Sequence, residues 1–205
     1  MKTKIKDIEA KTKDSRKIII SSLSREDASD FCQCLNMIMV ENKNDRTLTA
    51  SYPNTLEDLK IFILNVTNSE NDFILIAKID SGIGNKVVGI CDFFDSTEED
   101  DSEQVAEIGV SIISEYQGKG IAYLLMKNCI EIAKTSTNIK KIILTVKEDK
   151  INAKNLYQKL GFKITNKNEQ KKFYWMELAL LHFVTLMIIS SFVFFTNYVD
   201  VSPPL

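Results

Sequence analysis

The sequence predicts an α/β fold in which one mixed sheet is flanked by helices. Apolar and polar residues alternate along 106–112, as they do in a half-buried strand. After a turn with two glycines, apolar residues recur at helical spacing from Ile121 to Ile132. The segment KIILTV at 141–146 follows, and this strand-helix-strand order favours two parallel neighbouring strands. At 205 residues and 44% hydrophobic content, the chain is long enough for one domain with a full core.

The N-terminal segment is predicted to be a mobile charged arm. Residues 1–16 alternate lysines with acidic residues and contain no apolar run, which also argues against a secretory signal. The domain is expected to span 17–178 and to begin with a strand at 17–21. Ser24 is a favourable N-cap for the next helix, which is predicted to end near Val40.

The middle of the chain is predicted to hold one helix and two strands. Thr55 caps the helix, and strands at 73–80 and 86–94 are separated by a glycine-containing turn. The next connection, 95–103, carries six carboxylates within nine residues. Such a run is typical of a solvated loop, although it would also attract a cation.

The last part of the domain is predicted to be a helix and a β-hairpin. Gly161 is expected to end the helix in the left-handed conformation that glycine adopts readily. Strands at 162–165 and 173–178 then enclose the polar turn 166–172.

The C-terminal tail, 179–205, is predicted to form an apolar helix. The nineteen residues 178–196 contain no Asp, Glu, Lys or Arg. As a helix they would span about 28 Å, close to the hydrocarbon thickness of a bilayer. Lysines precede this stretch and only Asp200 follows it, so the positive-inside rule predicts a membrane anchor with a cytosol-facing domain. The alternative is a helix packed on this domain or on a second subunit of a homodimer.

Charge and cysteine content exclude several classes of function. The formal net charge of −2 gives no overall basic field, which argues against nucleic acid as a partner. Cys32, Cys34, Cys91 and Cys129 form no C-x-x-C pair, and the only histidine is His182 in the tail, so no metal site is expected. Free thiols in a reducing compartment are predicted, although the C-x-C spacing also admits a redox pair.

The turn at 117–120 has the composition of an anion site. The first amides of a helix have no intrahelical partner and carry the positive end of the helix dipole. Gly118 and Gly120 have no side chains to keep a ligand away. The sequence contains neither the dinucleotide fingerprint nor the ATP-binding loop motif.

Two segments resemble the GNAT-type N-acetyltransferases. The first matches their Q/R-x-x-G-x-G/A signature with Gln117, Gly118, Lys119, Gly120, Ile121 and Ala122. The second, NAKNLYQKLGF at 152–162, is similar to their A-x-x-L-Y-x-K-L-G-F segment, and the order and spacing of the two also agree. The resemblance covers about 17–178. It implies a mostly antiparallel sheet in which two central parallel strands splay apart.

The resemblance implies acetyl-CoA as co-substrate. Backbone amides of 117–122 would bind its pyrophosphate, and main-chain groups near Ile112 and Ile113 would pair with its pantetheine arm. Asn152 is a further candidate contact, although it is out of register with the Asn of many relatives, where this chain has Lys150. The polar stretch 42–54 lies where such enzymes commonly shape the acceptor site.

The implied activity is transfer of an acetyl group to a primary amine, which needs a base and an acid. Glu107 resembles the strand glutamate that many relatives use as base, and the alternative is a surface carboxylate. Tyr157 is the acid candidate, and the alternative is a core tyrosine whose hydroxyl caps a backbone group. A different class of function, a catalytically silent acyl-CoA-binding or membrane-tethered interaction module, also remains open.

Overall fold

The computed structural model describes residues 6–41, 52–80, 82, 84–96 and 104–180. Its strands are β1 (Ile8–Lys11), β2 (Lys17–Ser22), β3 (Phe73–Asp80), β4 (Asn85–Asp95), β5 (Val105–Ile112), β6 (Lys141–Lys147), β7 (Lys163–Asn168) and β8 (Phe173–Ala179). Its helices are α1 (Ala28–Glu41), α3 (Leu56–Asn68), α4 (Ile121–Ser136) and α5 (Ile151–Lys159), with short 3-10 helices η1 (Arg25–Asp27) and η2 (Ser114–Tyr116).

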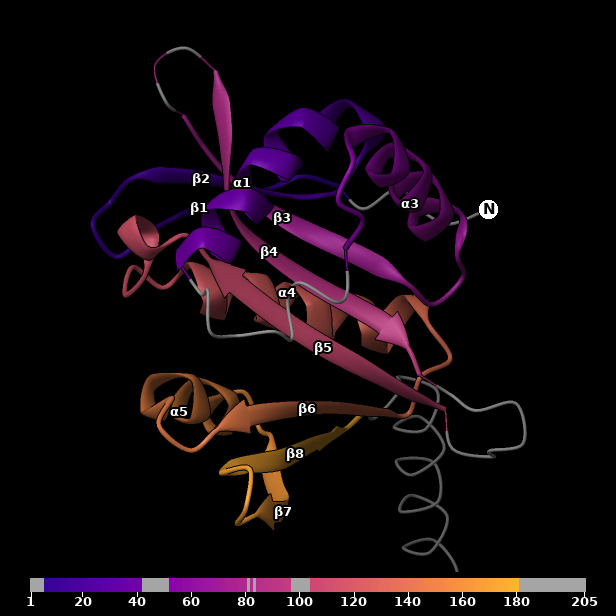
Figure 1. Ribbon diagram of the computed structural model, residues 1–205, viewed down its shortest axis with the longest axis vertical. Helices are drawn as coiled ribbons and strands as arrows, with labels where there is room; N and C mark the ends of the chain where they lie inside the picture. Colours follow the sequence, from indigo (N-terminus) through magenta and orange to yellow (C-terminus); the bar gives the residue numbers. More distant parts are fainter. Residues whose placement is uncertain (1–5, 42–51, 81, 83, 97–103, 181–205) are drawn as a thin grey trace, which may run out of the picture.

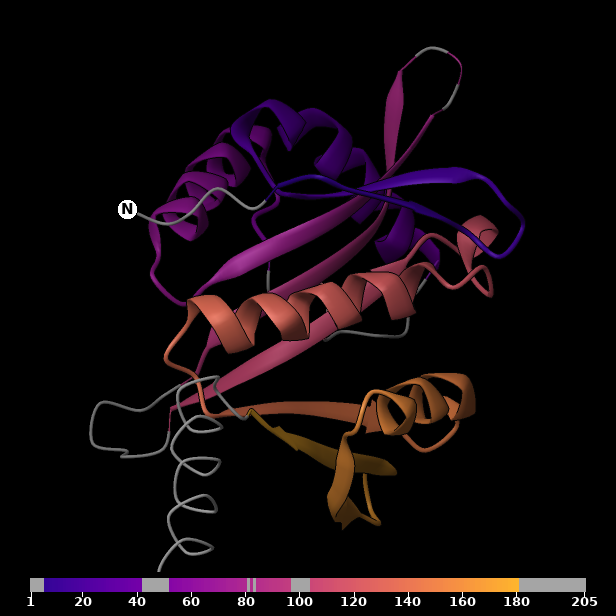
Figure 2. The same ribbon diagram turned by 180° about the vertical axis from the view of Figure 1, so that it is seen from behind.

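All eight strands form one sheet in the order β1-β2-β3-β4-β5-β6-β8-β7. Every neighbouring pair is antiparallel except β5 and β6, which are parallel. The predicted mixed, mostly antiparallel sheet is therefore confirmed. Helix α4 lies behind β5 in Figure 1 and in front of it in Figure 2, so it covers the sheet face opposite to α1 and α3.

Two close contacts show which strand positions face which helices. The ring of Phe94 lies 6.1 Å from the ring of Phe62 on α3. Gly89 faces α4 instead, because a Cβ at Gly89 would lie 2.5 Å from Ile112 Cδ1 and 3.2 Å from Leu125 Cδ1. Side chains alternate along a strand, so Ile90, Asp92 and Phe94, which follow the β-bulge of β4, face α1 and α3. Their neighbours on β5 are the odd-numbered residues, which form the less apolar face of that strand.

The parallel strands separate soon after they meet. Pairing between β5 and β6 is limited to Val105–Glu107 opposite Lys141–Ile143. Beyond this point β5 remains paired with β4, and β6 remains paired with β8. The two strands diverge in Figure 1 from their common end, which confirms the predicted splay.

The helix starts follow the predicted capping chemistry. Thr55 Oγ1 accepts a hydrogen bond from the Asp58 amide at 3.1 Å, as expected of an N-cap. Ser24 and Asp27 form a capping box, but the first turn is the 3-10 helix η1 before α1 begins. Gly161 has a φ of 98°, so the left-handed end after α5 is confirmed.

The predicted arm over 1–16 is wrong for the part that forms β1. Ile8 lies opposite Ile20 in the antiparallel β1–β2 pair. The apolar residues of β1, Ile8 and Ala10, pack against the core, whereas Glu9 is exposed. A four-residue strand with two apolar side chains was too short to register as an apolar run. Pairing with β2, rather than local propensity, orders this segment.

The end of the domain lies slightly beyond the expected boundary. Strand β8 includes Ala179, and the Leu180 amide donates to the Lys140 carbonyl at 2.7 Å. The remaining tail, 181–205, lies outside the described residues, as do 42–51 and the acidic stretch 97–103. Within the described part of the chain, no helix is long and apolar enough to cross a membrane.

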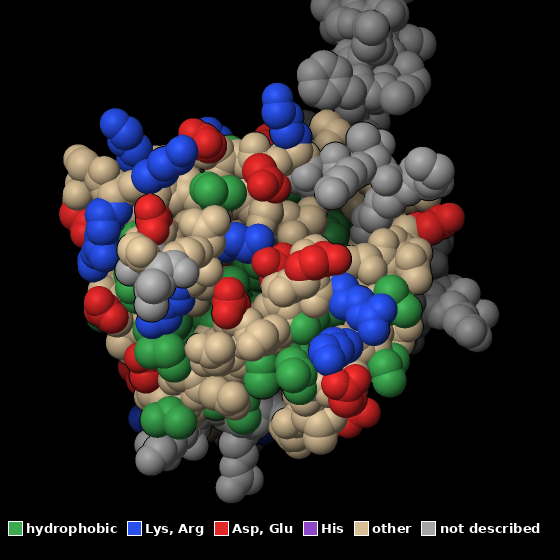
Figure 3. Space-filling view, turned by 90° about the horizontal axis from the view of Figure 1, so that it is seen from above, with side chains coloured by type: hydrophobic (Ala, Val, Ile, Leu, Met, Phe, Trp, Pro, Cys, Tyr) green, Lys and Arg blue, Asp and Glu red, His purple; other side chains and the backbone are tan. Residues whose placement is uncertain are grey.

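Charged side chains of both signs are interspersed on the face of the molecule in Figure 3, without a continuous field of one sign. The face drawn there therefore shows no stripe of basic side chains.

Candidate active site

The glycine turn leads directly into the N-terminus of α4. Gly118 and Gly120 have φ values of 73° and 85°, in the region that glycine adopts without steric cost. Apart from its two chain neighbours, no described residue has an atom within 4 Å of the place where a Gly118 Cβ would be, so the turn is open there. Gly120 is the N-cap, and no side chain caps the helix. The first-turn amides, including those of Ile121 and Ala122, are thus turned toward this opening with the positive end of the dipole.

Strand β5 ends where Gln117 folds back onto it. Gln117 Nε2 donates to the Ile112 carbonyl at 3.0 Å, and the Ile113 amide donates to the Val88 carbonyl of β4 at 3.1 Å. Main-chain groups alternate along a strand, so those of Val110 and Ile112 point away from β4, toward the diverging β6. Of the two positions expected to pair with pantetheine, Ile113 therefore already uses its amide in the sheet.

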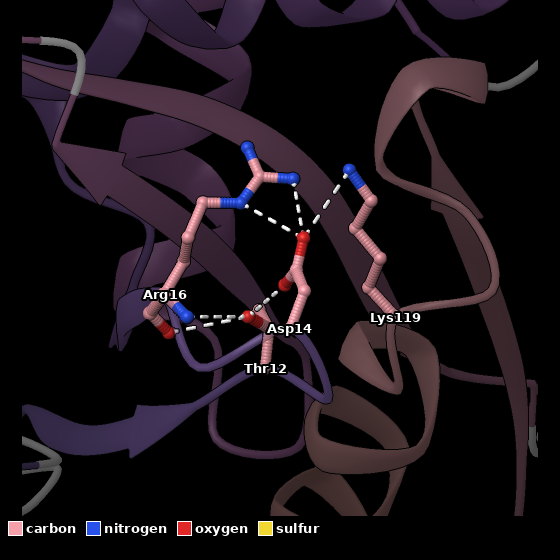
Figure 4. A network of polar contacts seen from close by, with 4 residues as sticks. All are labelled: Thr12, Asp14, Arg16 and Lys119. Carbon is pink, nitrogen blue, oxygen red and sulfur yellow. Dashed lines mark hydrogen bonds and ion pairs between the residues drawn. The ribbon is translucent and has the colours of Figure 1, made fainter.

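The β1–β2 turn packs against the glycine turn (Figure 4). The Lys13 amide donates to the Lys119 carbonyl at 2.9 Å, and Lys13 Cγ lies 3.5 Å from the position of a Gly120 Cβ. Asp14 Oδ2 lies 2.8 Å from an Arg16 guanidinium nitrogen and 3.6 Å from Lys119 Nζ. The hydrogen bond from Arg16 holds the pKa of Asp14 well below its usual value.

The ring of Tyr116 lies within a cluster of cations beside this turn. The guanidinium carbon of Arg16 and the ammonium nitrogens of Lys86 and Lys119 lie 5.3, 5.9 and 5.3 Å from the ring centroid. Cations at a helix N-terminus suit a multiply charged anion such as a pyrophosphate.

Glu107 stands where the parallel strands separate. It is the last residue of β5 that pairs with β6, opposite Ile143. Its exposed side chain shares the α1 and α3 face with Gly109 and Ser111. Desolvation, and second the negative charge of Asp92, raise the pKa of Glu107. A raised pKa brings a carboxylate closer to the range in which a general base works at neutral pH.

Asp92 is a second carboxylate on the same face. It pairs in register with Gly109, and a Cβ on Gly109 would collide with Asp92 Oδ1, so the glycine leaves room for the carboxylate in its present position. The Tyr52 hydroxyl donates to Asp92 Oδ2 at 2.5 Å. Burial raises the pKa of Asp92, whereas the hydrogen bonds from Tyr52 and from the Gly109 backbone act in the opposite direction.

Comparison with known proteins establishes the family. A family model described as the acetyltransferase (GNAT) family matches residues 37–162, which is more than half of the chain. The chain belongs to the GNAT acetyltransferase family. It is therefore an acyltransferase with acetyl-CoA as its cofactor. The glycine turn and the start of α4 fit this cofactor, since they combine an open loop, unpaired helix amides and nearby cations.

Solved structures share the fold of this GNAT protein. A GNAT acetyltransferase from Streptococcus pneumoniae is 25% identical with a TM-score of 0.66, covering 80% of this chain and 99% of its own. A Salmonella typhimurium protein described as an acetyltransferase, solved with acetyl-CoA, is 16% identical with a TM-score of 0.65, covering 80% and 94%. A Vibrio cholerae spermidine N-acetyltransferase is 20% identical with a TM-score of 0.57, covering 78% and 94%. No curated protein sequence matches the chain.

Tyr157 of this GNAT protein lies on α5, with its ring 6.1 Å from the ring of Phe162. Its hydroxyl makes no hydrogen bond to any residue in the described part of the chain, so it does not cap a backbone group there. Burial, followed by the negative charges of Cys91 and Asp92 on β4, raises the pKa of Tyr157 to about 12. The phenol is therefore protonated at neutral pH, as a proton donor must be.

The remaining candidates are Asn152 and the cysteine pair Cys32 and Cys34. Asn152 is exposed in the first turn of α5, and no described residue hydrogen-bonds its side chain. All four cysteines are free thiols, and three of them are buried. Burial raises the pKa of Cys34 to about 12, which disfavours the thiolate that a Cys32–Cys34 redox pair would need.

Sequence reasoning missed Asp92 and Tyr52. A signal for Asp92 was present, because it interrupts an otherwise apolar strand and a glycine occupies the neighbouring strand. No local pattern marked Tyr52, whose contact with Asp92 spans forty residues of sequence.

Proposed function

We propose that this GNAT protein is an N-acetyltransferase that moves the acetyl group of acetyl-CoA directly to a primary amine of a protein, a peptide or a small molecule. The observation that carries the proposal is the end of β5–β6 pairing at Glu107. A carboxylate with a raised pKa stands where the sheet opens. The anion-binding turn follows the far end of the same strand, and the free phenol of Tyr157 comes from the helix after β6.

Acetyl-CoA supplies a thioester whose carbonyl carbon accepts the amine. The lone pair of the neutral amine forms the N–C bond, and Glu107 takes, directly or through water, the proton that the nitrogen then loses. Main-chain groups of Val110 and Ile112 orient the carbonyl. As the C–S bond breaks, its electron pair stays on sulfur, and Tyr157 donates a proton to that sulfur. Proton exchange with solvent then restores Glu107 and Tyr157.

The test is thiol release from acetyl-CoA across a panel of amines, with mass spectrometry of the products. Polyamines belong in the panel because one structural neighbour is a spermidine N-acetyltransferase. Thiol release that depends on an added amine is expected. Tight acetyl-CoA binding without release for any amine or protein lysate would identify a catalytically silent acyl-CoA-binding module instead.

Three features remain predictions from the sequence. They are the membrane anchor formed by the tail, the homodimer, and the steering of a cationic acceptor by the acidic stretch 95–103. The proposed acetyl transfer does not depend on any of them.

A further inference from the structure

We propose that Tyr52 is a positioning residue of the acetyl transfer, which acts on Glu107 through the buried carboxylate of Asp92. The Tyr52 hydroxyl keeps Asp92 ionised, and the negative charge of Asp92 makes Glu107 a better proton acceptor. The inference rests on the proposed acetyl transfer with Glu107 as base. It assigns a part in the reaction to two residues that act through Glu107 and do not themselves accept the proton.

Two aromatic rings fix the direction of the Tyr52 hydroxyl. The ring of Tyr52 makes edge contacts with Phe31 of α1 and Phe62 of α3, each at a centroid distance of 5.7 Å. Only 8% of the Tyr52 surface is exposed. Thr55, the N-cap of α3, follows three residues later and ties this part of the chain to the helix. The hydroxyl is thus held on Asp92 Oδ2 at 2.5 Å, since a buried tyrosine hydroxyl needs a partner.

The carboxylate of Asp92 lies over Gly109, close to Glu107. Asp92 Oδ1 occupies the place where a Gly109 Cβ would be. Glu107 is two residues away from Gly109 on β5, so it projects from the same face about 7 Å along the strand. Because the adjacent position on this face is a glycine, no side chain of β5 separates the two carboxylates. Charges at this spacing lie within the screening length of about 8 Å at physiological ionic strength.

Hydrogen bonds, and not an ion pair, keep Asp92 ionised. Asp92 forms no ion pair with any residue in the described part of the chain. Burial raises its pKa, whereas the hydrogen bond from Tyr52, followed by that from the Gly109 backbone, lowers it. A hydrogen bond to a carboxylate favours the charged form. Loss of the Tyr52 hydroxyl should therefore raise the pKa of Asp92 and keep this group neutral up to a higher pH.

The other titratable groups that interact with Tyr52 or Asp92 are uncharged at neutral pH, apart from Glu107. They are Cys34 of α1, Cys91 of β4 and Tyr157 of α5. Burial raises the pKa of Cys34 and Tyr157 to about 12, and it raises that of Cys91 well above its usual value. The neighbours from β3 and α3 are the apolar side chains of Ile74 and Phe62. Asp92 thus acts on Glu107, whose pKa is raised by desolvation and then by the Asp92 charge.

The experiment is an NMR titration of the side-chain carboxyl carbons of Glu107 and Asp92 in isotope-labelled protein. It compares the wild type, Tyr52→Phe, Asp92→Asn and the double variant. Phe keeps the two ring contacts of Tyr52, so Tyr52→Phe is expected to fold. The pKa of Glu107 should fall in each single variant. It should fall no further in the double variant, because a neutral Asn has no charge for the hydroxyl to maintain.

Tyr174→Phe is the matched control, because it also removes a tyrosine hydroxyl that donates to a carboxylate. Tyr174 lies on β8, and its hydroxyl lies 3.2 Å from Glu148 Oε1. This variant should leave the pKa of Glu107 unchanged. A shift equal to that of Tyr52→Phe would show a general effect of losing a tyrosine hydroxyl and would overturn the inference.

The same change should appear in the pH profile of kcat/KM. In Tyr52→Phe the acidic limb should move to lower pH, in the same direction as in Asp92→Asn, and the plateau rate should fall because a weaker base accepts the proton less readily. If Tyr52 only supported the fold, its replacement would lower stability or rate without moving the limb. An unmoved limb would therefore overturn the inference.

An unchanged pKa of Glu107 in Tyr52→Phe, or a further fall in the double variant, would also overturn the inference. If Tyr52→Phe does not fold, the wild-type titration decides. Ionisation of Asp92 before Glu107 supports the inference, and an Asp92 that stays protonated while Glu107 titrates overturns it. The NMR titration needs no turnover, so a failure of the proposed acetyl transfer appears separately, as absence of thiol release with every amine.

Discussion

The register of β4 and β5 places Asp92 close enough to Glu107 for its charge to raise the pKa of Glu107. This pKa should determine the pH dependence of the reaction. A base works only when deprotonated, so kcat/KM should rise with pH through the pKa of Glu107. Because desolvation and the charge of Asp92 both raise that pKa, removing the charge should lower it. We expect Asp92→Asn to move the acidic limb of the pH profile to lower pH.

The control for this prediction is Glu107→Gln, which should lose rate and lose the acidic limb altogether. Asn keeps the shape of Asp and can still accept from the Tyr52 hydroxyl, so the Asp92 variant should remain folded. An acidic limb that stays in place in Asp92→Asn would show that the two carboxylates are not coupled. Full activity of Glu107→Gln would remove the base assignment.

Tyr157 offers a cleaner test, because its hydroxyl has no hydrogen bond to lose within the described residues. Tyr157→Phe should lower kcat by about a hundredfold, the typical effect of losing a general acid, with acetyl-CoA affinity and thermal stability unchanged. Tyr123→Phe on α4 is the matched control, since the ring under Lys159 is kept. Turnover at the wild-type rate in Tyr157→Phe would make this residue a packing tyrosine.

Among the elements, the turn before α4 should govern cofactor binding. Gly120→Glu is expected to abolish acetyl-CoA binding in calorimetry, because it places a negative charge where the pyrophosphate would lie. Any side chain at this φ of 85° is strained, so Gly120→Ala is needed to separate strain from charge. Gly82→Glu adds the same side chain at a φ of 83° in a remote turn and should bind normally. Unchanged affinity in folded Gly120→Glu would eliminate the pyrophosphate assignment.

The β1–β2 hairpin should support the same turn. A chain that begins at residue 17 loses β1 together with the Lys13 amide bond and the Asp14 ion pair to Lys119. It is expected to unfold at a lower temperature and to bind acetyl-CoA more weakly than a chain that begins at residue 6, which keeps the hairpin. Identical affinity and stability of the two chains would restore the original interpretation of 1–16 as an arm without a role in the fold.

At the scale of the whole molecule, the periodic segments were predictable and the long-range contacts were not. The strand at 106–112, the helix from Ile121 and the cap at Gly161 follow from local patterns that burial of one face imposes. The splay between β5 and β6 came from family resemblance, since no property of a single strand shows where its pairing stops. Strand β1 was missed because only its partner β2 orders it. Asp92 was missed because Gly109, which leaves room for its carboxylate, and Tyr52, which hydrogen-bonds it, are remote in sequence.

The last prediction concerns the C-terminal tail, and the structure shows where a shortened chain should end. Leu180 is buried and bonded to Lys140, so a shortened chain should end at Leu180 and not at Leu178, which would leave β8 incomplete. The full-length protein is expected to sediment with membranes and resist carbonate extraction, whereas the chain ending at Leu180 should stay in solution with its acetyl transfer intact.

The sequon at 65–67 reports the orientation of the domain in a eukaryotic cell. Asn65 is exposed on α3, so burial does not prevent its modification, and a cytosol-facing domain predicts that it carries no glycan. A sequon introduced after Asn197 should be glycosylated instead, because the predicted anchor would place that end of the chain in the lumen. A glycan on Asn65 would reverse the topology. Recovery of the full-length chain as a discrete soluble monomer or dimer would mean that residues 181–196 do not anchor it, and the acetyl-transfer proposal would be unaffected.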